Sequence, residues 1–274
     1  MGLKLMFITN SPTIARIAQN AGVDRIFVDL EKLGKDERQA HVNSVKSNHS
    51  LEDIRPVKEI LTTSELLVRV NPFYRGTQEE VNRAIEAGAD ILMLPMFKTA
   101  QEVGEFIRLV DGRARVNLLL ETQEACKNLD DILAVPGIDE VHIGLNDLHL
   151  SMRKRFMFEL LADGTVEWLC EKLRHSGLFY GFGGVARVSY GDLPAEHIIA
   201  EHIRLGSGMV ILSRSFCDLA TLDNLEVIRD RFDSGVENIR AFEARASGWT
   251  PEMFGANQVI LKGYLEGILR KLTS

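Results

Sequence analysis

Apolar residues along the chain fall into two alternating patterns. Short runs rich in β-branched and aromatic residues are each followed by a longer stretch in which apolar positions recur with the 3.6-residue period of an α-helix. The runs are apolar along their whole length, which is typical of strands in a parallel sheet covered by helices on its outer face. The expected strands span residues 3–9, 24–30, 65–71, 89–95, 115–121, 140–146, 179–184 and 208–214.

This alternation occurs eight times. From Leu3 to Gly208 the runs recur about every 29 residues, which is the length of one strand plus one crossover helix. Eight strand–helix units predict an α/β fold, a closed (β/α)8 TIM barrel. An open, doubly wound sheet is the alternative fold for the same pattern.

Signals for helix ends support the same division of the chain. Ser11 followed by Pro12 predicts a helix start, and the segments Thr77–Glu80 and Thr99–Glu102 have the spacing of capping boxes. Glycines just ahead of the next strand are expected to end helices. They are Gly22, Gly88, Gly112, Gly137, Gly177 and Gly206.

The chain continues well beyond the eighth strand, further than one closing helix needs. We expect a TIM-barrel domain over 1–219 and C-terminal helices over 220–274, one near 220–246 and one over 251–273. The last helix has an apolar face that packs either on its own barrel or on another subunit. We expect a homo-oligomer, a trimer or a hexamer, in which these helices form contacts.

Composition and charge narrow the class of protein. The chain is 45% hydrophobic and 26% charged with a net charge of −7, which fits a soluble globular protein and excludes a disordered one. The acidic balance argues against nucleic acid and against a polybasic membrane anchor, so small molecules are the expected partners. We expect neither a membrane helix nor a secretory signal, and therefore a cytoplasmic location. Cys126, Cys170 and Cys217 are far apart, so disulfides and structural zinc are not expected.

Two carboxylates at predicted strand ends form the first candidate site. In a TIM barrel the active site lies at the C-terminal ends of the strands. Glu121 and Asp147 are 26 residues apart, one strand–helix unit, which predicts neighbouring strand ends ~5 Å apart. Such carboxylates repel unless a cation lies between them, so Mg²⁺ or Mn²⁺ is one interpretation. Helix capping, or an ion pair with Arg69, is the other.

Arg69 lies within the otherwise apolar segment LLVRVNP. A buried guanidinium needs an anion. That anion is either the carboxylate or enolate of a substrate, or a barrel carboxylate such as Glu31. The gap between Arg69 and Glu121 suits a small oxo acid.

Five segments carry a resemblance to a known enzyme family. They are FVDLEK, LLVRVNP, AIEAGADILMLPMFKTAQEV, LLLETQEACKNLDDILAVPGIDEVHIGLNDLHLSM and GFGGVAR. The chain resembles the metal-dependent class II pyruvate aldolases typified by 4-hydroxy-2-oxoheptanedioate aldolase, a family that also contains the citrate lyase β-subunit and malyl-CoA lyases. The resemblance extends from about residue 4 to 215 and is most specific over 121–151.

The resemblance implies a lyase or aldolase that uses a divalent metal ion, Mg²⁺ or Mn²⁺, to form the enolate of a small 2-oxo acid, pyruvate or oxaloacetate. On the matching positions, it makes Glu121 and Asp147 the metal ligands. It makes Arg69 the catalytic and substrate-binding arginine that stabilises the enolate oxygen. It places the substrate carboxylate on backbone N–H groups of the loops after the fourth and sixth strands. These loops contain Met96, Phe97, Leu145 and Asn146.

Lys32 departs from the family pattern, which has a histidine directly after the acidic residue that ends the second strand. This chain has Glu31-Lys32 at that point. A lysine side chain can act as a general base when its amine is neutral and as a general acid when it is protonated, so Lys32 is a candidate catalytic residue. A solvated side chain at the rim of the site is the alternative.

Two further features lie near the proposed site. His149 follows Asp147 by two residues and would point the same way if the backbone stays extended, which makes it a candidate for metal binding or proton transfer. Gly181, Gly183 and Gly184 in the seventh strand are interpreted as room for a close-packed turn, in preference to a phosphate site.

Two alternatives to a 2-oxo acid aldolase stay open. A lyase of CoA thioesters from the same family would need a basic rim, which Lys32, Arg75, Lys98 and the run 153–155 offer. A non-catalytic oligomeric relative would keep the barrel and lose activity through the change at Lys32.

Overall fold

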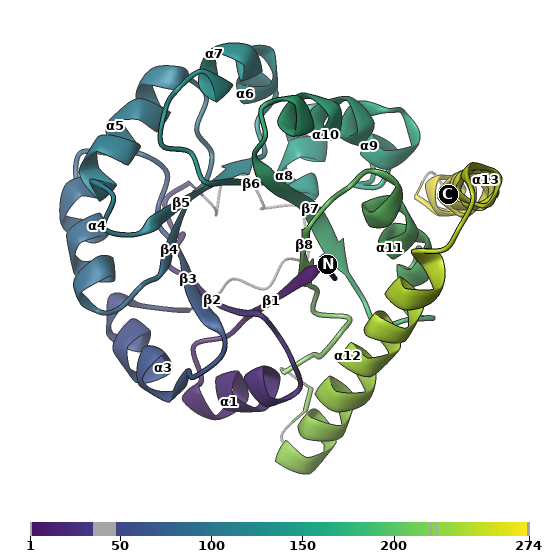
Figure 1. Ribbon diagram of the computed structural model, residues 1–274, viewed down its shortest axis with the longest axis horizontal. Coiled ribbons are helices and arrows are strands. Elements are labelled where there is room, and N and C mark those ends of the chain that lie inside the picture. The colour runs from purple at the N-terminus through teal and green to yellow at the C-terminus, as the bar shows by residue number, and fades with distance from the viewer. Residues whose placement is uncertain (1, 35–47, 220, 223, 273–274) are drawn as a thin grey trace.

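The chain folds into a closed barrel of eight parallel strands in sequential order, as the computed structural model shows (Figure 1). The structure describes residues 2–34, 48–219, 221–222 and 224–272. Strand pairing runs from β1 to β8 and back to β1, so the sheet has no free edge. The strands are β1 (Lys4–Ile8), β2 (Arg25–Asp29), β3 (Glu65–Arg69), β4 (Ile91–Leu94), β5 (Arg115–Leu120), β6 (Glu140–Ile143), β7 (Phe179–Val185) and β8 (Met209–Leu212).

Helices surround this ring and cover its outer face (Figure 1). They bury the outward side chains of the strands, which is why the strands are apolar along their whole length. The helices are α1 (Pro12–Asn20), η1 (Leu51–Asp53), α3 (Ile54–Ile60), α4 (Thr77–Glu86), α5 (Ala100–Val110), α6 (Gln123–Lys127), α7 (Leu129–Leu133), α8 (Leu145–Ser151), α9 (Glu159–Ala162), α10 (Thr165–His175), α11 (Ala195–Arg204), α12 (Leu225–Ala246) and α13 (Pro251–Lys271).

The predicted barrel is confirmed, and the open sheet is not observed. All eight strands lie where they were expected, but most end earlier than the apolar runs. The difference that matters most for the candidate site is in the sixth strand. It was expected over 140–146 but ends at Ile143. The next residues begin α8, so Asp147 lies in the first turn of a helix and not at a strand end.

Most of the expected helix ends are confirmed. The Ser11 hydroxyl accepts from the N–H of Ile14, and Thr99 and Glu102 form a capping box. The expected box at Thr77–Glu80 was wrong, because α4 begins after Gly76 and the Thr77 hydroxyl accepts from the backbone N–H of Tyr74. The six glycines expected at helix ends all have positive φ.

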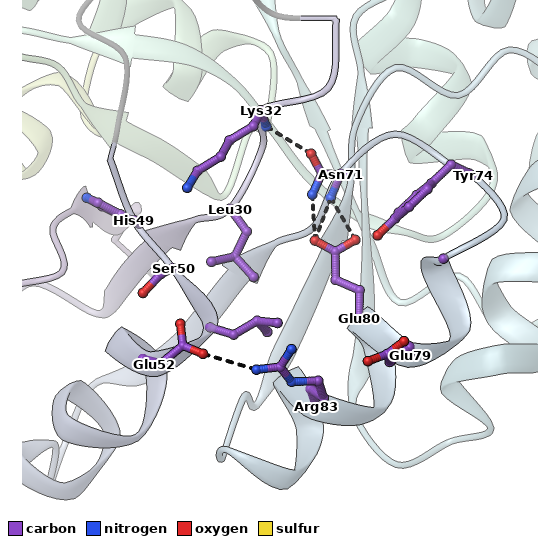
Figure 2. Close-up of a pocket in the computed structure, with 12 residues that line it drawn as sticks. Leu30, Lys32, His49, Ser50, Glu52, Asn71, Tyr74, Glu79, Glu80 and Arg83 are labelled. Carbon is purple, nitrogen blue, oxygen red and sulfur yellow. Dashed lines mark hydrogen bonds and ion pairs between the residues drawn. The ribbon is translucent and has the colours of Figure 1, made fainter.

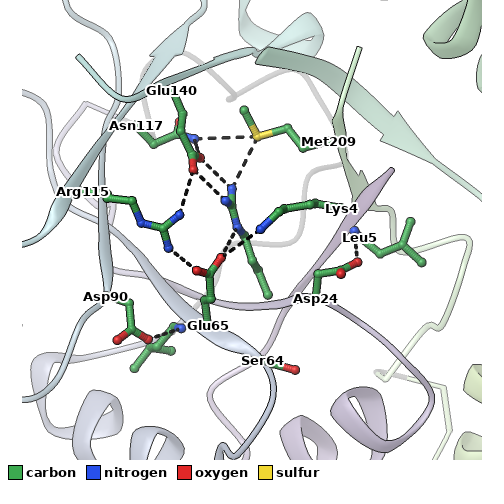
Figure 3. Close-up of polar contacts among 12 residues, drawn as sticks. Lys4, Leu5, Asp24, Ser64, Glu65, Asp90, Arg115, Asn117, Glu140 and Met209 are labelled. Atoms are coloured by element: carbon green, nitrogen blue, oxygen red, sulfur yellow. Dashed lines mark hydrogen bonds and ion pairs between the residues drawn. The ribbon is translucent and has the colours of Figure 1, made fainter. Parts of the chain in front are cut away.

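A charged network fills the N-terminal end of the barrel interior. Arg25 is fully buried and donates from Nη1 and Nη2 to the two carboxylate oxygens of Glu140, each at 2.6 Å. Its Nε donates to Glu65 at 3.1 Å, and Arg115 lies between Glu65 and Glu140 (Figure 3). Asn117 donates to Glu140 at 3.0 Å. The network satisfies charges that would otherwise be costly to bury.

An apolar layer separates this network from the opposite end of the barrel. Inward residues alternate along each strand, so that β2 presents Arg25, Phe27 and Asp29 in turn. Side chains from the other strands complete the layer around Phe27. The buried members are Met6, Phe27, Leu67, Ile91, Met93, Leu119 and Met209.

The C-terminal helices pack against the barrel of their own chain. α12 contacts α11 and α1, which closes the helical ring next to β1 (Figure 1). α13 contacts α11 and α9 and buries Leu261 and Leu265. A second apolar face of α13 stays exposed in the single chain and contains Val259, Ile260 and Tyr264. The boundary expected at 219 and the homo-oligomer stay predictions.

Two other expectations concern membranes and cysteines. Among the described residues, no helix is long and apolar enough to cross a membrane. Cys126, Cys170 and Cys217 are buried free thiols. Burial raises the pKa of Cys126 and of Cys170 to about 12, so both stay protonated.

We predict that Arg25→Met destabilises the protein by about 3 kcal/mol, because the Glu140 carboxylate would lose its bidentate partner while staying buried. Urea unfolding of the variant measures this loss. The double variant Arg25→Met/Glu140→Met should regain most of the stability, since it removes both charges. A single variant as stable as the wild type would show that Arg115 alone compensates Glu140.

We also predict that the exposed face of α13 is covered by a neighbouring subunit. Replacing both Val259 and Ile260 by Glu should then lower the solution mass measured by light scattering, while thermal unfolding of the subunit changes little. The exposed control variant Lys127→Met should keep the mass of the wild type. An unchanged mass in the double variant contradicts the prediction.

Candidate active site

Arg69 ends β3 and is held by two carboxylates from the end of β2. Its Nε and Nη2 donate to the two carboxylate oxygens of Asp29, each at 2.8 Å. Its Nη1 lies 3.3 Å from Oε2 of Glu31. Both acids are buried, and the guanidinium lies 5.5 Å from the ring centre of Phe27. Barrel carboxylates therefore fix the orientation of Arg69, which is the pairing that the sequence left open.

The guanidinium of Arg69 stays protonated between these carboxylates. Burial by itself lowers the pKa of the guanidinium, but the Asp29 and Glu31 carboxylates outweigh burial and raise it, and Glu121 adds to this effect. A guanidinium has five N–H donors in a rigid plane. The bonds to Asp29 use two of them, so others are available for a substrate anion.

Glu121 follows β5 and is buried beside the loop after β4. Its Oε1 accepts from the backbone N–H of Met96 at 3.2 Å. Met96 has a φ of 57°, which is uncommon for a residue with a side chain and turns its N–H toward the carboxylate. On the other side, a Cβ at Gly144 would lie 2.8 Å from Oε2 of Glu121. Only a glycine at 144 leaves room for the carboxylate.

Asp147 lies in the first turn of α8, three residues after Gly144, and is buried. A carboxylate is favoured there by the helix dipole. The helical backbone overturns the expectation for His149, because residues two apart on a helix point in different directions. His149 is buried, and its Nδ1 lies 3.2 Å from the carbonyl oxygen of Leu145.

The donor set of Glu121 and Asp147 fits a hard divalent ion. Both are buried carboxylates on adjacent strand–helix turns, and the lack of a side chain at Gly144 leaves room for the Glu121 carboxylate. Within the described ranges, no three His, Cys, Asp or Glu side chains form a metal cluster. Two carboxylates are enough for Mg²⁺, which takes its other ligands from substrate and water.

The residues expected near a substrate carboxylate lie in the loop after β4 and, instead of a loop after β6, at the start of helix α8. Phe97 is buried, and its carbonyl oxygen accepts from the Thr122 hydroxyl at 2.9 Å. Leu145 and Asn146 are the first two residues of α8. The N–H groups in the first turn of a helix have no partner within the helix, so they are suited to bind an anion.

Lys32 lies just outside this group. Its side chain is exposed, and its backbone N–H donates to the Asn71 side chain at 2.9 Å. The side chain extends over a polar cavity of about 370 Å³, on the side of His49 (Figure 2). Among the described residues, the ammonium group has no ion pair or hydrogen bond. Lys32 is thus close to Glu31 in sequence but faces a separate hollow between the loops after β2 and β3.

The wall of that cavity joins the two loops. Asn71 accepts from the backbone N–H groups of Lys32 and Leu33 and donates from Nδ2 to Glu80 at 2.7 Å (Figure 2). Burial raises the pKa of Glu80, although the bonds from Asn71 oppose the rise. The capping motif predicted at Thr77–Glu80 therefore serves a different purpose, because Glu80 holds Asn71 and not a helix end.

Three residues of this region were not singled out from the sequence. Asp29 is the bidentate partner of Arg69, and the period-2 pattern of FVDLEK already placed it on the face of Glu31. His49 accepts from the backbone N–H of Asp29 at 3.0 Å, but its distance along the chain from β2 gave no signal. His142 is fully buried inside the barrel on β6 and had no polar neighbour in sequence that marked it.

Comparisons with known proteins identify the family of the chain. The model of the HpcH/HpaI aldolase/citrate lyase family matches residues 4–157, more than half of the chain. A 4-hydroxy-4-methyl-2-oxoglutarate aldolase of Chaetomium globosum is 24% identical over 220 residues, which cover 68% of this chain and 75% of that protein. A hydroxypyruvate/pyruvate aldolase of Rhizorhabdus wittichii is 33% identical over 81 residues, 27% of this chain and 32% of that protein.

Solved structures show the same fold. An HpcH/HpaI aldolase from Desulfitobacterium hafniense has a TM-score of 0.63 and 18% identity, and the match covers 87% of this chain and 93% of that one. The citrate synthase SbnG has a TM-score of 0.59 and 16% identity, with 78% and 87% covered. The chain therefore belongs to the HpcH/HpaI aldolase/citrate lyase family, and its enzyme class is that of a carbon–carbon lyase.

Proposed function

We propose that this lyase acts on a small 2-oxo acid, pyruvate or oxaloacetate, as a metal-dependent aldolase that cleaves or forms a bond to the enolate carbon. The main support is the orientation of Arg69, which two oxygens of Asp29 and one of Glu31 fix at the end of the barrel beside Glu121. A guanidinium held in this way stabilises a developing enolate oxygen without reorganising during the reaction. The names of the similar aldolases agree with a 2-oxo acid substrate.

Glu121 and Asp147 would hold Mg²⁺ or Mn²⁺, which polarises the keto group of a 2-oxo acid when bound. Asp29 keeps the Arg69 plane in place, and the remaining N–H groups of Arg69 bind the keto oxygen as it gains charge. The backbone N–H groups of Leu145 and Asn146 bind the substrate carboxylate in this proposal, together with the loop that contains Met96 and Phe97.

Lys32 is proposed to transfer a proton at the methyl carbon of the 2-oxo acid. Its amine belongs to a flexible four-carbon side chain that starts next to Glu31, and Glu31 is the residue whose carboxylate contacts Arg69. In the structure it extends over the neighbouring cavity, which is the solvated position considered as the alternative (Figure 2). Kinetics of a Lys32 variant separate the two roles.

We predict that Glu121→Ala and Asp147→Ala each abolish Mn²⁺ binding in titration calorimetry and stop the exchange of pyruvate methyl protons in deuterated water, observed by NMR. Both side chains lie at the end of the barrel and outside its apolar layer, so the circular dichroism spectrum should not change. Glu201→Gln, which alters a buried carboxylate on α11, is the control and should keep both activities. Wild-type protein that binds no Mn²⁺ and exchanges no protons would sink the proposed function.

For Lys32 we predict that Lys32→Met slows pyruvate proton exchange by about 10²–10⁴-fold, the usual contribution of general acid–base catalysis. Mn²⁺ affinity should stay close to that of the wild type. Lys32→His should recover part of the rate, because imidazole can carry the same proton. The exposed control Lys127→Met should have no effect. Equal exchange rates in Lys32→Met and wild type would leave Lys32 as a solvated rim charge.

A further inference from the structure

The seventh strand contains an irregularity next to the proposed metal ligands. Its pairing with β8 joins Gly181 to Met209 and then skips to Gly184 with Ile211. Gly183 falls in the gap and has a φ of 52°, in the left-handed region. An extra residue of this kind is a β-bulge, and bulges beside active sites change the direction of the chain.

One side chain binds the bulge from inside the barrel. Nε2 of His142, on β6, lies 3.1 Å from the carbonyl oxygen of Gly183. A carbonyl oxygen can only accept, so Nε2 must carry the proton. Burial, opposed by the hydrogen bond to Gly183 and assisted by the positive charges of Arg25 and Arg69, lowers the pKa of His142 to about 4. The ring is therefore neutral, and Nε2–H is its one donor.

The bulge in turn contacts the helix that carries Asp147. A Cβ at Gly183 would lie 2.7 Å from Cδ1 and 3.2 Å from Cγ of Leu145, so the Leu145 side chain occupies the space that a residue other than glycine would fill. Leu145 is buried and is the first residue of α8. Asp147 follows in the same turn.

We infer that His142 is a positioning residue: its hydrogen bond to Gly183 holds the β7 bulge, and the bulge sets the place of Leu145 and of the first turn of α8 with Asp147. The inference rests on the proposed function for the role of Asp147. The hydrogen bond that the structure shows for the His142 side chain goes to the Gly183 carbonyl oxygen. His142 acts through contacts that run from β6 to β7 and back to the helix after β6.

A purely structural role is the competing explanation, in which any side chain that fills the barrel at this level would suffice. His202 provides the comparison. It is also a fully buried neutral histidine beside β7, where it stacks on the Phe182 ring with centroids 3.7 Å apart. Its Nδ1 bonds to the Ser207 hydroxyl and not to the bulge. Replacing it disturbs packing at the same strand without removing the bond to Gly183.

The experiment compares His142→Phe, His142→Gln and His202→Phe by Mn²⁺ titration calorimetry. His142→Phe keeps a ring but loses the donor, and should weaken Mn²⁺ binding by about 10–100-fold, the usual effect of removing a group that orients a metal ligand. His142→Gln keeps an N–H donor and should stay within about threefold of the wild type by the same scale. His202→Phe should bind Mn²⁺ like the wild type even if its melting temperature falls.

A second measurement needs no metal. Hydrogen exchange of the metal-free protein, followed by mass spectrometry, should be faster in His142→Phe over 183–187 and over 145–151, and unchanged there in His142→Gln. Gly183→Ala tests the same contact from the other side, because its Cβ would displace Leu145. It should accelerate exchange over 145–151 and weaken Mn²⁺ binding with His142 intact.

Three outcomes overturn the inference. Unchanged exchange over 145–151 in His142→Phe would show that the bulge does not position α8. Equal losses in His142→Phe and His142→Gln would show that the N–H donor does not account for the effect of the histidine. Equal losses in His142→Phe and His202→Phe would reduce the effect to packing. If wild-type protein binds no Mn²⁺, the proposed function fails, while the exchange data still decide whether His142 positions α8.

Discussion

The ion pair between Arg25 and Glu140 crosses the interior of the barrel from β2 to β6, two strands on opposite sides of an eight-strand ring. Because both groups are buried, closing the barrel costs about 3 kcal/mol more if the carboxylate of Glu140 is left without the guanidinium of Arg25. That pairing fixes the distance across the barrel at its N-terminal end. The remaining strands lie on either side of this ion pair. On one side, Glu65 and Arg115 balance the charges of Arg25 and Glu140.

The same chemistry serves another purpose at the opposite end. Arg69 also has a bidentate carboxylate partner, but Asp29 comes from the adjacent strand and leaves the centre of the barrel clear. At the N-terminal end, the Arg25 guanidinium is used for structural ion pairs. At the opposite end, Asp29 fixes the Arg69 guanidinium, and some of its N–H donors are left for a substrate. The apolar layer around Phe27 separates the two networks. A substitution in one network therefore does not directly change the contacts of the other.

The sequence predicted the parts of the fold that depend on period and local capping. Eight apolar runs identified the strands, and Ser11 and Thr99 were recognised as caps, because these signals act within a few residues. Two predictions failed for different reasons. Glu80 has the spacing of a capping box but bonds to Asn71, which lies outside the helix, in the loop after β3. The strand expected to reach Asn146 ends at Ile143, because helix α8 begins at once and an apolar run does not distinguish a strand from the start of a helix.

The candidate site shows the same limit. The sequence identified Glu121, Asp147 and Arg69, because a charged residue at a predicted strand end or within an apolar run can be recognised without knowing its partner. Asp29 and His142 are defined by what they bind, Arg69 and the Gly183 carbonyl, and those partners lie 40 and 41 residues away. A histidine in an apolar strand gives no indication of which carbonyl it will meet, since a bulge in a third segment creates that carbonyl position.

The left-handed backbone of Met96 couples the shape of the loop after β4 to Glu121. A residue with a side chain in this conformation costs about 1 kcal/mol or more relative to glycine, yet the conformation turns the Met96 N–H toward Glu121. A glycine at 96 would relieve this strain and also loosen the loop, because glycine populates many other conformations when the contact to Glu121 breaks. When the contact breaks, a methionine relaxes to right-handed or extended backbone. The loop after β4 therefore keeps its shape only while the Glu121 carboxylate accepts the bond from Met96.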